Sequence, residues 1–412
     1  MTIAHEVPHR IHQGEMSLET AALMERYAFD YGQTYDSYLV TEAGREYFWS
    51  SGRRGVVGFL RRGRHVHVMG GLLAAEEHRE MLLREFTEFT SENRLTATFH
   101  NLPHGDLRLF RRHGFQTSKF GEEPIVRLDQ TCWQGKSYEW VRRQENYCVR
   151  QGVCAEEIAA DPNDTEYRRH VVAELEDLNR EHLAETLHAR ELQFFQGKFK
   201  PLELGRRRIF VARQDRRIVA FVVCNPGLGG NFWAIETYRR RNDAPRGVVP
   251  YLMMQVMRQL KEEGVAYCSL SLMPFVRCWP PIDRESVILP FVCGFWWRRM
   301  NWLFDVRGIY HYKSRFRPHY REMFLATHPK ITCRSLIATA ATWKLFEFNP
   351  LQLARHAWDL RRRGARRRTL SEPSPRPDRV IRELRAAAIA LPEAAKGNGA
   401  NRARLRTEAG SE

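Results

Sequence analysis

The order of strand-like and helix-like segments constrains the fold most, because it repeats in two successive blocks of the chain. Short apolar segments rich in β-branched and aromatic residues predict strands at residues 47–50, 55–60, 65–70, 97–100 and 124–128, and again at 208–212, 217–224, 231–236 and 266–272. Helices are expected between them, at residues 76–93, 105–113, 137–151, 165–184 and 248–263. This order predicts two α/β (α+β) domains joined without a flexible linker.

Composition changes along the chain divide it further. The expected regions are an N-terminal arm, a first domain, a second domain, C-terminal helices and a disordered basic tail, at residues 1–20, 21–130, 131–330, 331–366 and 367–412. The C-terminal helices, expected at 335–346 and 351–363, carry aromatic residues beside arginines. They could lie in a membrane interface or pack on the second domain as ordinary helices.

The net charge and the cysteines indicate which partners and which cellular compartment to expect. The net charge of +16 favours a polyanion such as tRNA or an anionic membrane surface, although about half of the excess lies beyond residue 360, in a tail that could be only solubilising. The eight cysteines have no spacing typical of a metal site or a disulfide framework. With no signal peptide and no apolar run of roughly 20 residues, we expect a cytoplasmic protein, soluble or peripheral at the inner face of the membrane.

The segment from residue 234 to residue 274 is the most informative for chemistry. A strand delivers Glu236 and Arg239, a turn contains Gly247, and a helix then begins. Helix N-termini and guanidinium groups suit the binding of anions or of developing negative charge. The same residues could equally form a surface turn with ion pairs.

These motifs resemble the aminoacyl-phosphatidylglycerol synthases, the phosphatidylglycerol lysyltransferase C-terminal domain family. Its aspartate, Met-Arg, Ala-Pro-x-Gly and Leu-Gly-x-Ala-Pro-like motifs correspond to Glu236, Tyr238-Arg239, Ala244-Pro245-Arg246-Gly247 and Leu270-Ser271-Leu272-Met273-Pro274. The resemblance extends over roughly residues 25–325, through segments at 109–115, 119–126, 135–146, 191–199 and 312–318.

The resemblance implies two tandem GNAT-like acyltransferase domains, an aminoacyl-tRNA donor and a lipid hydroxyl as acceptor, usually that of phosphatidylglycerol. The acceptor alcohol would displace the tRNA ribose oxygen from an aminoacyl ester. This step needs a base, stabilisation of an oxyanion and positioning of both substrates, but no cofactor or metal. Coenzyme A is disfavoured as donor because the acetyl-coenzyme A loop of ordinary GNAT enzymes is not present in intact form here.

Site residues are carried over from the family by position. Glu236 could hold the donor ammonium or act as base, and Arg239 could stabilise an oxyanion or a phosphate. Lys313 with Arg315 could hold the lipid phosphate or the tRNA end. The remaining substrate-binding candidates are Glu191 and Gly247. Surface ion pairs are the alternative for the charged members of this set.

One predicted helix carries the candidates for tRNA binding. Arg142, Arg143, Asn146 and Arg150 share it with aromatic residues such as Trp140, and basic groups mixed with aromatic rings suit nucleic acid. A solvated helix face is the alternative. The aromatic stretch at residues 291–304 is expected to form wall or core of the second domain rather than a membrane anchor, with part of it lining an acceptor tunnel.

The sequence also departs from the family pattern. Glutamate replaces the aspartate at position 236, and Met69-Gly70-Gly71-Leu72 stands where the family usually has Gly-Asp-Pro-Val. The sequence contains no counterpart of the flippase-like membrane domain of the best-known members, so transport of the product lipid is not expected of this chain. Two other functions stay open: transfer to a peptide or small metabolite, and an inactive GNAT pair that binds tRNA or anionic membrane.

Overall fold

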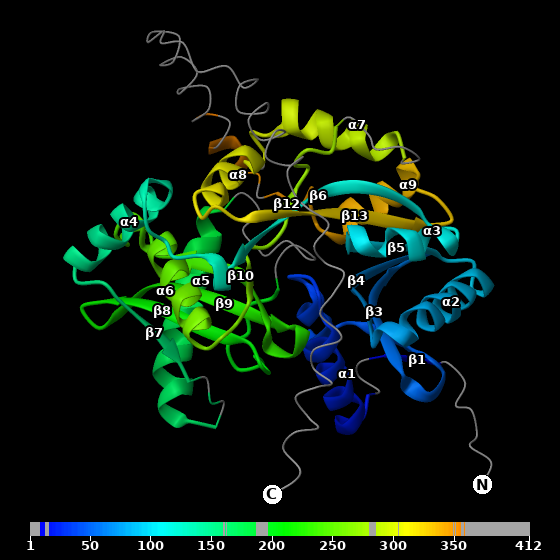
Figure 1. The fold of residues 1–412 in the computed structure, drawn as a ribbon, viewed down its shortest axis with the longest axis horizontal. Coiled ribbons are helices and arrows are strands. Elements are labelled where there is room, and N and C mark those ends of the chain that lie inside the picture. Colours follow the sequence, from blue (N-terminus) through cyan, green and yellow to red (C-terminus); the bar gives the residue numbers. More distant parts are fainter. Residues whose placement is uncertain are drawn as a thin grey trace, which may run out of the picture. The chain divides into compact units, whose positions relative to one another are not determined.

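One continuous β-sheet joins strands from both predicted domains (Figure 1). The computed structural model describes residues 9–12, 16–159, 161, 163–186, 197–279, 286–303, 305–348, 350, 352–355 and 358. Across the described residues, the strand order is β1-β2-β3-β4-β5-β13-β6-β11-β10-β9-β8-β7, and β12 pairs with β6. The sheet and the helices that cover it lie within the unit Met1–Leu353.

The elements follow the predicted segments closely. The strands are β1 His9–His12, β2 Glu46–Trp49, β3 Gly55–Arg62, β4 His65–Ala74, β5 Thr96–Pro103, β6 Gln116–Arg127, β7 Cys154–Ile158, β8 Arg208–Gln214, β9 Arg217–Gly227, β10 Phe232–Arg240, β11 Tyr267–Ser269, β12 Met273–Pro274 and β13 His319–His328. The α-helices are α1 Leu18–Tyr31, α2 Glu76–Glu92, α3 Leu107–Arg112, α4 Glu139–Arg150, α5 Val172–Glu185, α6 Val248–Glu262, α7 Ile288–Phe295, α8 Val306–Ser314 and α9 Cys333–Thr342. The helix predicted at 351–363 lies largely outside the described residues, as does the tail.

Each half of the sheet contains the same unit, in which a helix connects two parallel strands. Helix α2 connects β4 to β5, and α6 connects β10 to β11, while the neighbouring pairs are antiparallel. The two parallel pairings end at Phe99 and at Ser269. Two residues further on, Asn101 and Ser271 both adopt a left-handed backbone, with φ of 56° and 64°. This repetition agrees with the predicted tandem GNAT-like architecture of the α/β class, which is confirmed.

The two halves share strands across the predicted domain boundary. Strand β13 lies between β5 and β6, antiparallel to both, although it comes from the end of the second predicted domain. Strand β6 also pairs with β11 of the second half. The boundary at residues 130/131 stays a prediction, but the hydrogen bonding of the sheet crosses it.

Alternating side chains of the second half fill two cores. Val222 on β9 packs in the cluster that contains Met253 of α6, whereas its neighbour Phe221 packs in the cluster that contains Leu175 of α5. Helices α6 and α5 therefore cover opposite faces of β9, as the two-residue period of a strand requires. Helix α6 ends before Gly264, whose φ is 81°, as the sequence predicts.

Two buried histidines in the first half, His67 and His100, should make the free energy of unfolding decrease in acid. Burial, with smaller contributions from His65 and Arg62, lowers the pKa of His67 to about 3, and burial lowers the pKa of His100 well below its usual range. Below about pH 6.5 both imidazoles bind a proton in the unfolded chain but stay neutral in the folded protein. Their contribution to the free energy of unfolding is therefore fully present above that pH and is lost as the pH falls toward 3.

Replacing His67 with glutamine is therefore expected to flatten the acid limb of the stability curve. The free energy of unfolding should depend less steeply on pH, by about 1.4 kcal/mol per pH unit between pH 6 and pH 4. Urea unfolding at a series of pH values measures this slope. The same change at the exposed His319 serves as control, and an equal flattening there would contradict the assignment to His67.

Candidate functional site

The carboxylate of Glu236 lies where β10 parts from β11. The parallel pairing of these strands ends at Ala234, and a β-bulge against β9 falls between Ile235 and Thr237. Bulges re-aim side chains, and here Glu236 is buried. Its Oε1 accepts a hydrogen bond from the Gly197 N–H at 2.6 Å, and its Oε2 accepts one from the Thr237 hydroxyl at 2.6 Å.

Burial controls the electrostatics of this carboxyl group. It raises the pKa of Glu236, and the Thr237 hydrogen bond and the Arg207 guanidinium lower that pKa in part. Arg207 itself forms an ion pair with Glu42 at 3.3 Å. A desolvated acid thus lies near a cation, and each of its two oxygens accepts a hydrogen bond from the protein.

Arg239, three residues along β10, is also buried and contacts α5. Its Nε donates to Oδ1 of Asn179 at 3.1 Å, and its Nη1 donates to the carbonyl of Tyr238 at 3.0 Å. Burial and the nearby Arg239 charge lower the pKa of His182 on α5 to about 4. A neutral imidazole and a guanidinium therefore lie together between β10 and α5.

Lys313 reaches the same end of the strand pair from α8. Its Nζ donates to the carbonyl of Ser271 at 3.0 Å and to that of Leu272 at 3.4 Å. The Ser271 hydroxyl in turn donates to the carbonyl of Ile235 at 2.7 Å. One residue, Ser271, therefore links Lys313 to the backbone immediately before Glu236. Burial lowers the pKa of Lys313 to about 7, against an opposing contribution from Glu123.

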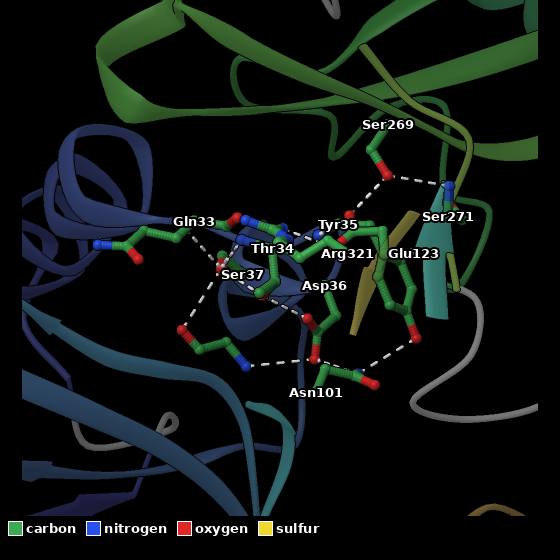
Figure 2. A network of polar contacts seen from close by, with 11 residues as sticks. Gln33, Thr34, Tyr35, Asp36, Ser37, Asn101, Glu123, Ser269, Ser271 and Arg321 are labelled. Carbon is green, nitrogen blue, oxygen red and sulfur yellow. Dashed lines mark hydrogen bonds and ion pairs between the residues drawn. The ribbon is translucent and has the colours of Figure 1, made fainter. Parts of the chain in front are cut away.

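Glu123 on β6 is the centre of a buried polar network (Figure 2). Its Oε1 accepts from the Ser269 hydroxyl at 2.6 Å and from the Tyr35 N–H at 3.2 Å, and its Oε2 pairs with Arg321 at 2.5 Å. Figure 2 shows these side chains converging from β6, β11, β13 and the segment after α1. The network ties the first half of the sheet to the strand pair that carries Glu236.

Asp36 extends the network into the first half. It accepts from the Thr34 hydroxyl at 2.7 Å, from the Asn101 amide at 2.8 Å and from the Gly70 N–H at 3.3 Å. Burial raises the pKa of Asp36 to about 6, although these three hydrogen bonds oppose the shift. Gly70 lies two residues beyond the end of the β4/β5 pairing, the position that Glu236 occupies in the second half. In the first half, the carboxylate at this place therefore comes from Asp36, in the segment after α1.

These network residues were missed at the sequence level. Glu123 lies within the 119–126 segment that resembles the family, but no feature of the segment distinguished it from its neighbour Glu122. Asp36 and Asn101 belong to no motif, and only the sheet topology brings them together.

Three of the four tRNA-binding candidates, Arg143, Asn146 and Arg150, line a basic, aromatic groove on α4. The groove, here called the α4 groove, has a volume of about 920 Å³ and is lined by Trp140, Arg143, Gln144, Asn146, Tyr147, Val149, Arg150 and Arg246. Arg143 pairs with Glu139 at 2.6 Å and is otherwise exposed. Arg142 lies beside this lining and donates to the carbonyls of Trp133 and Gly135, at 3.1 and 2.8 Å, which fixes the loop before α4.

Gly247 and Arg315 also belong to this region. Gly247 has a φ of 86°, and a Cβ placed there would lie 2.4 Å from Oε1 of Gln144, so glycine lets the turn before α6 approach α4. The Arg315 guanidinium lies over the Trp140 ring, 5.8 Å from its centroid. Arg315 is thus separated from Lys313, with which the sequence grouped it. Glu191 lies outside the described residues.

Two other kinds of feature are absent from the described residues. No cluster of three or more His, Cys, Asp or Glu side chains in that part of the chain could hold a metal ion. None of the helices described is long and apolar enough to cross a membrane.

Comparisons with known proteins point to a single family. The family described as phosphatidylglycerol lysyltransferase, C-terminal, matches residues 25–327. Phosphatidylglycerol lysyltransferase of Bacillus subtilis (strain 168) is 22% identical over 298 residues, 70% of this chain and 33% of that protein. The Staphylococcus aureus (strain COL) protein of the same name is also 22% identical over 298 residues, 72% of this chain and 34% of its own. The chain therefore spans about a third of the length of these curated relatives.

Two solved structures share the fold. L-PGS from Bacillus licheniformis has a TM-score of 0.64 at 21% identity, with 79% of this chain and 96% of that chain covered. The C-terminal domain of a putative lysylphosphatidylglycerol synthetase from Agrobacterium fabrum has a TM-score of 0.65 at 22% identity, with 78% and 95% covered.

Proposed function

Because the chain belongs to the family of the phosphatidylglycerol lysyltransferase C-terminal domain, we propose that it transfers an aminoacyl group from an aminoacyl-tRNA to the hydroxyl of a lipid such as phosphatidylglycerol. The observation that carries the proposal is the link through Ser271 between buried Lys313 and the backbone before buried Glu236, at the parting of β10 and β11. Burial shifts the pKa values of both Glu236 and Lys313, and groups with shifted pKa values cluster at functional sites.

Lys313 suits the role of general base. At a pKa of about 7, the neutral amine is well populated at physiological pH, where a base works best. A neutral amine has two N–H groups and one lone pair. The carbonyls of Ser271 and Leu272 take the two N–H groups, so the lone pair is left to accept the proton of the lipid hydroxyl.

Glu236 is suited to bind the aminoacyl donor, and Arg239 is suited to stabilise the negative charge that develops on its ester group. A carboxylate of Glu236 would bind the α-ammonium of the aminoacyl group by a charge-assisted hydrogen bond. The lipid oxygen then attacks the ester carbon, and Arg239 stabilises the resulting oxyanion. The bond to the tRNA ribose oxygen breaks, and that oxygen takes the proton from the Lys313 ammonium.

Labelled aminoacyl-tRNA incubated with the protein and phosphatidylglycerol vesicles tests the proposal. Label should appear in the organic extract, and a panel of charged tRNAs identifies the amino acid. Label only in an aqueous product would favour a peptide or small-metabolite acceptor. Binding of tRNA without any transfer would favour the inactive pair.

Reversing charge in the α4 groove should weaken the donor complex. The double change Arg143→Glu with Arg150→Glu is expected to raise the Kd for aminoacyl-tRNA at least about tenfold, because phosphate contacts dominate such affinities, and to flatten its salt dependence. Rates at saturating tRNA should change little. Filter binding at several salt concentrations measures this.

The matched control reverses Arg84 and Arg112, which are exposed arginines of the first half paired with Glu88 and Glu80. An equal loss of tRNA affinity in this control would mean that only net charge matters, and the α4 groove would lose its assignment.

A further inference from the structure

Helix α7 exposes a stripe of large apolar side chains to solvent. Val287 is 70% exposed, Phe291 66% and Phe295 51%. These residues are four apart and therefore lie on one face of the helix. The opposite face is buried through Leu289 and Cys293. Figure 1 shows α7 at the edge of the unit Met1–Leu353, outside β6.

The apolar surface continues beyond the end of α7. The π-helical turn Trp296–Met300 presents Arg298 and Arg299 to solvent, and Trp302 follows, 41% exposed. On the other side, the exposed Phe346 after α9 lies 6.5 Å from the Trp296 ring. We call the set of Val287, Phe291, Phe295, Trp302 and Phe346, with Arg298 and Arg299, the α7 surface.

The sequence predicted that residues 291–304 would be wall or core. Trp296 and Leu303 are buried as expected, but Phe291, Phe295 and Trp302 are exposed. Contiguous exposed aromatic side chains are rare on proteins without a partner, because each exposed ring gives up hydrophobic stabilisation.

We propose that the α7 surface docks on an anionic phospholipid bilayer, with Phe291 and Phe295 inserted among the lipid chains. Aromatic rings beside arginines are the composition of interfacial helices, whose cations attract anionic headgroups. Arg298 and Arg299 supply that charge at the end of the stripe. The inference rests on the proposed function, in which the acceptor is itself a bilayer lipid.

The position of the α7 surface favours a bilayer over a protein partner. The buried face of α7 packs in one core cluster with Met273 of β12 and Val306 at the start of α8. Helix α8 carries Lys313, and β12 follows the Ser271–Leu272 carbonyls that Lys313 contacts. Docking through α7 would therefore bring the bilayer to the helices that support the reactive amine.

Vesicle flotation of the full chain tests the docking. Wild-type protein should float with vesicles that contain phosphatidylglycerol, and the double change Phe291→Ser with Phe295→Ser should lower the partition coefficient at least about tenfold. Leu18→Ser on α1 is the matched control, since Leu18 is 91% exposed and remote in sequence. The double change Arg298→Glu with Arg299→Glu should weaken binding to phosphatidylglycerol vesicles but leave binding to phosphatidylcholine vesicles unchanged.

Activity assays separate this inference from the proposed function. The phenylalanine double variant should transfer to short-chain phosphatidylglycerol dispersed as monomers at the wild-type rate, and about tenfold more slowly to vesicles. Without transfer to either acceptor the proposed function fails, while flotation still reports on docking. Three results would overturn docking: flotation of the double variant like wild type, an equal loss in Leu18→Ser, or a dimer in solution that Phe291→Ser dissociates while flotation persists.

Discussion

Replacement of Lys313 by methionine is expected to lower kcat for aminoacyl transfer between about 10²-fold and 10⁴-fold, the usual contribution of a general base. Methionine has nearly the length of lysine and suits a buried site, so the fold should persist. What is lost is the lone pair that accepts the hydroxyl proton, together with two hydrogen bonds to the carbonyls of Ser271 and Leu272. Single-turnover rates with saturating substrates measure the effect.

The pH profile gives this prediction a second readout. Because burial lowers the pKa of Lys313 to about 7, the amine is protonated below that pH and cannot act as base. The wild-type rate should fall about tenfold per pH unit below pH 7 and level off above it. Lys313→Arg should be inactive throughout, since guanidinium keeps its proton. Exposed Lys330→Met is the control, and a limb near pH 7 that persists in Lys313→Met would rule out the assignment.

Local pattern predicted the elements well but not their long-range pairing. The helix at 76–93 and the end of α6 before Gly264 follow from periodicity and a glycine stop, which are local properties. The insertion of β13 between β5 and β6 depends on contacts more than 190 residues apart, such as that of Thr327 with Gln116. No local period encodes such pairing.

Side-chain direction explains why only part of the site could be predicted. Lys313 and Arg315 are two residues apart at the end of α8, and residues at that spacing do not share a helix face. Lys313 consequently points into the core, while Arg315 lies over Trp140. The first half of the stretch at 291–304, residues 291–297, has no polar residue on any helix face, so its sequence alone did not tell which rings would be exposed.

Glu236→Gln is expected to lower kcat/KM for aminoacyl-tRNA about 10²-fold, because a charge-assisted hydrogen bond to the donor ammonium contributes about 1.5–3 kcal/mol. The amide keeps the size of the side chain. Its oxygen can accept from the Gly197 N–H, and its NH₂ can donate to the Thr237 hydroxyl, so the bulge of β10 should survive. Exposed Glu262→Gln is the control and should match wild type.

The ammonium contact itself can be isolated by changing the donor. An N-acetylated aminoacyl-tRNA lacks the positive charge that Glu236 is proposed to bind, so wild-type protein should prefer the free donor about 10²-fold, and Glu236→Gln should lose most of that preference. Glu236→Asp shortens the side chain by one methylene, which displaces the carboxylate by about 1.5 Å from the Gly197 N–H, and we expect an intermediate loss. Glu236 is proposed to distinguish the two donors through its negative charge, which glutamine lacks. If Glu236→Gln still preferred the free ammonium as strongly as wild type, another group would have to bind that ammonium.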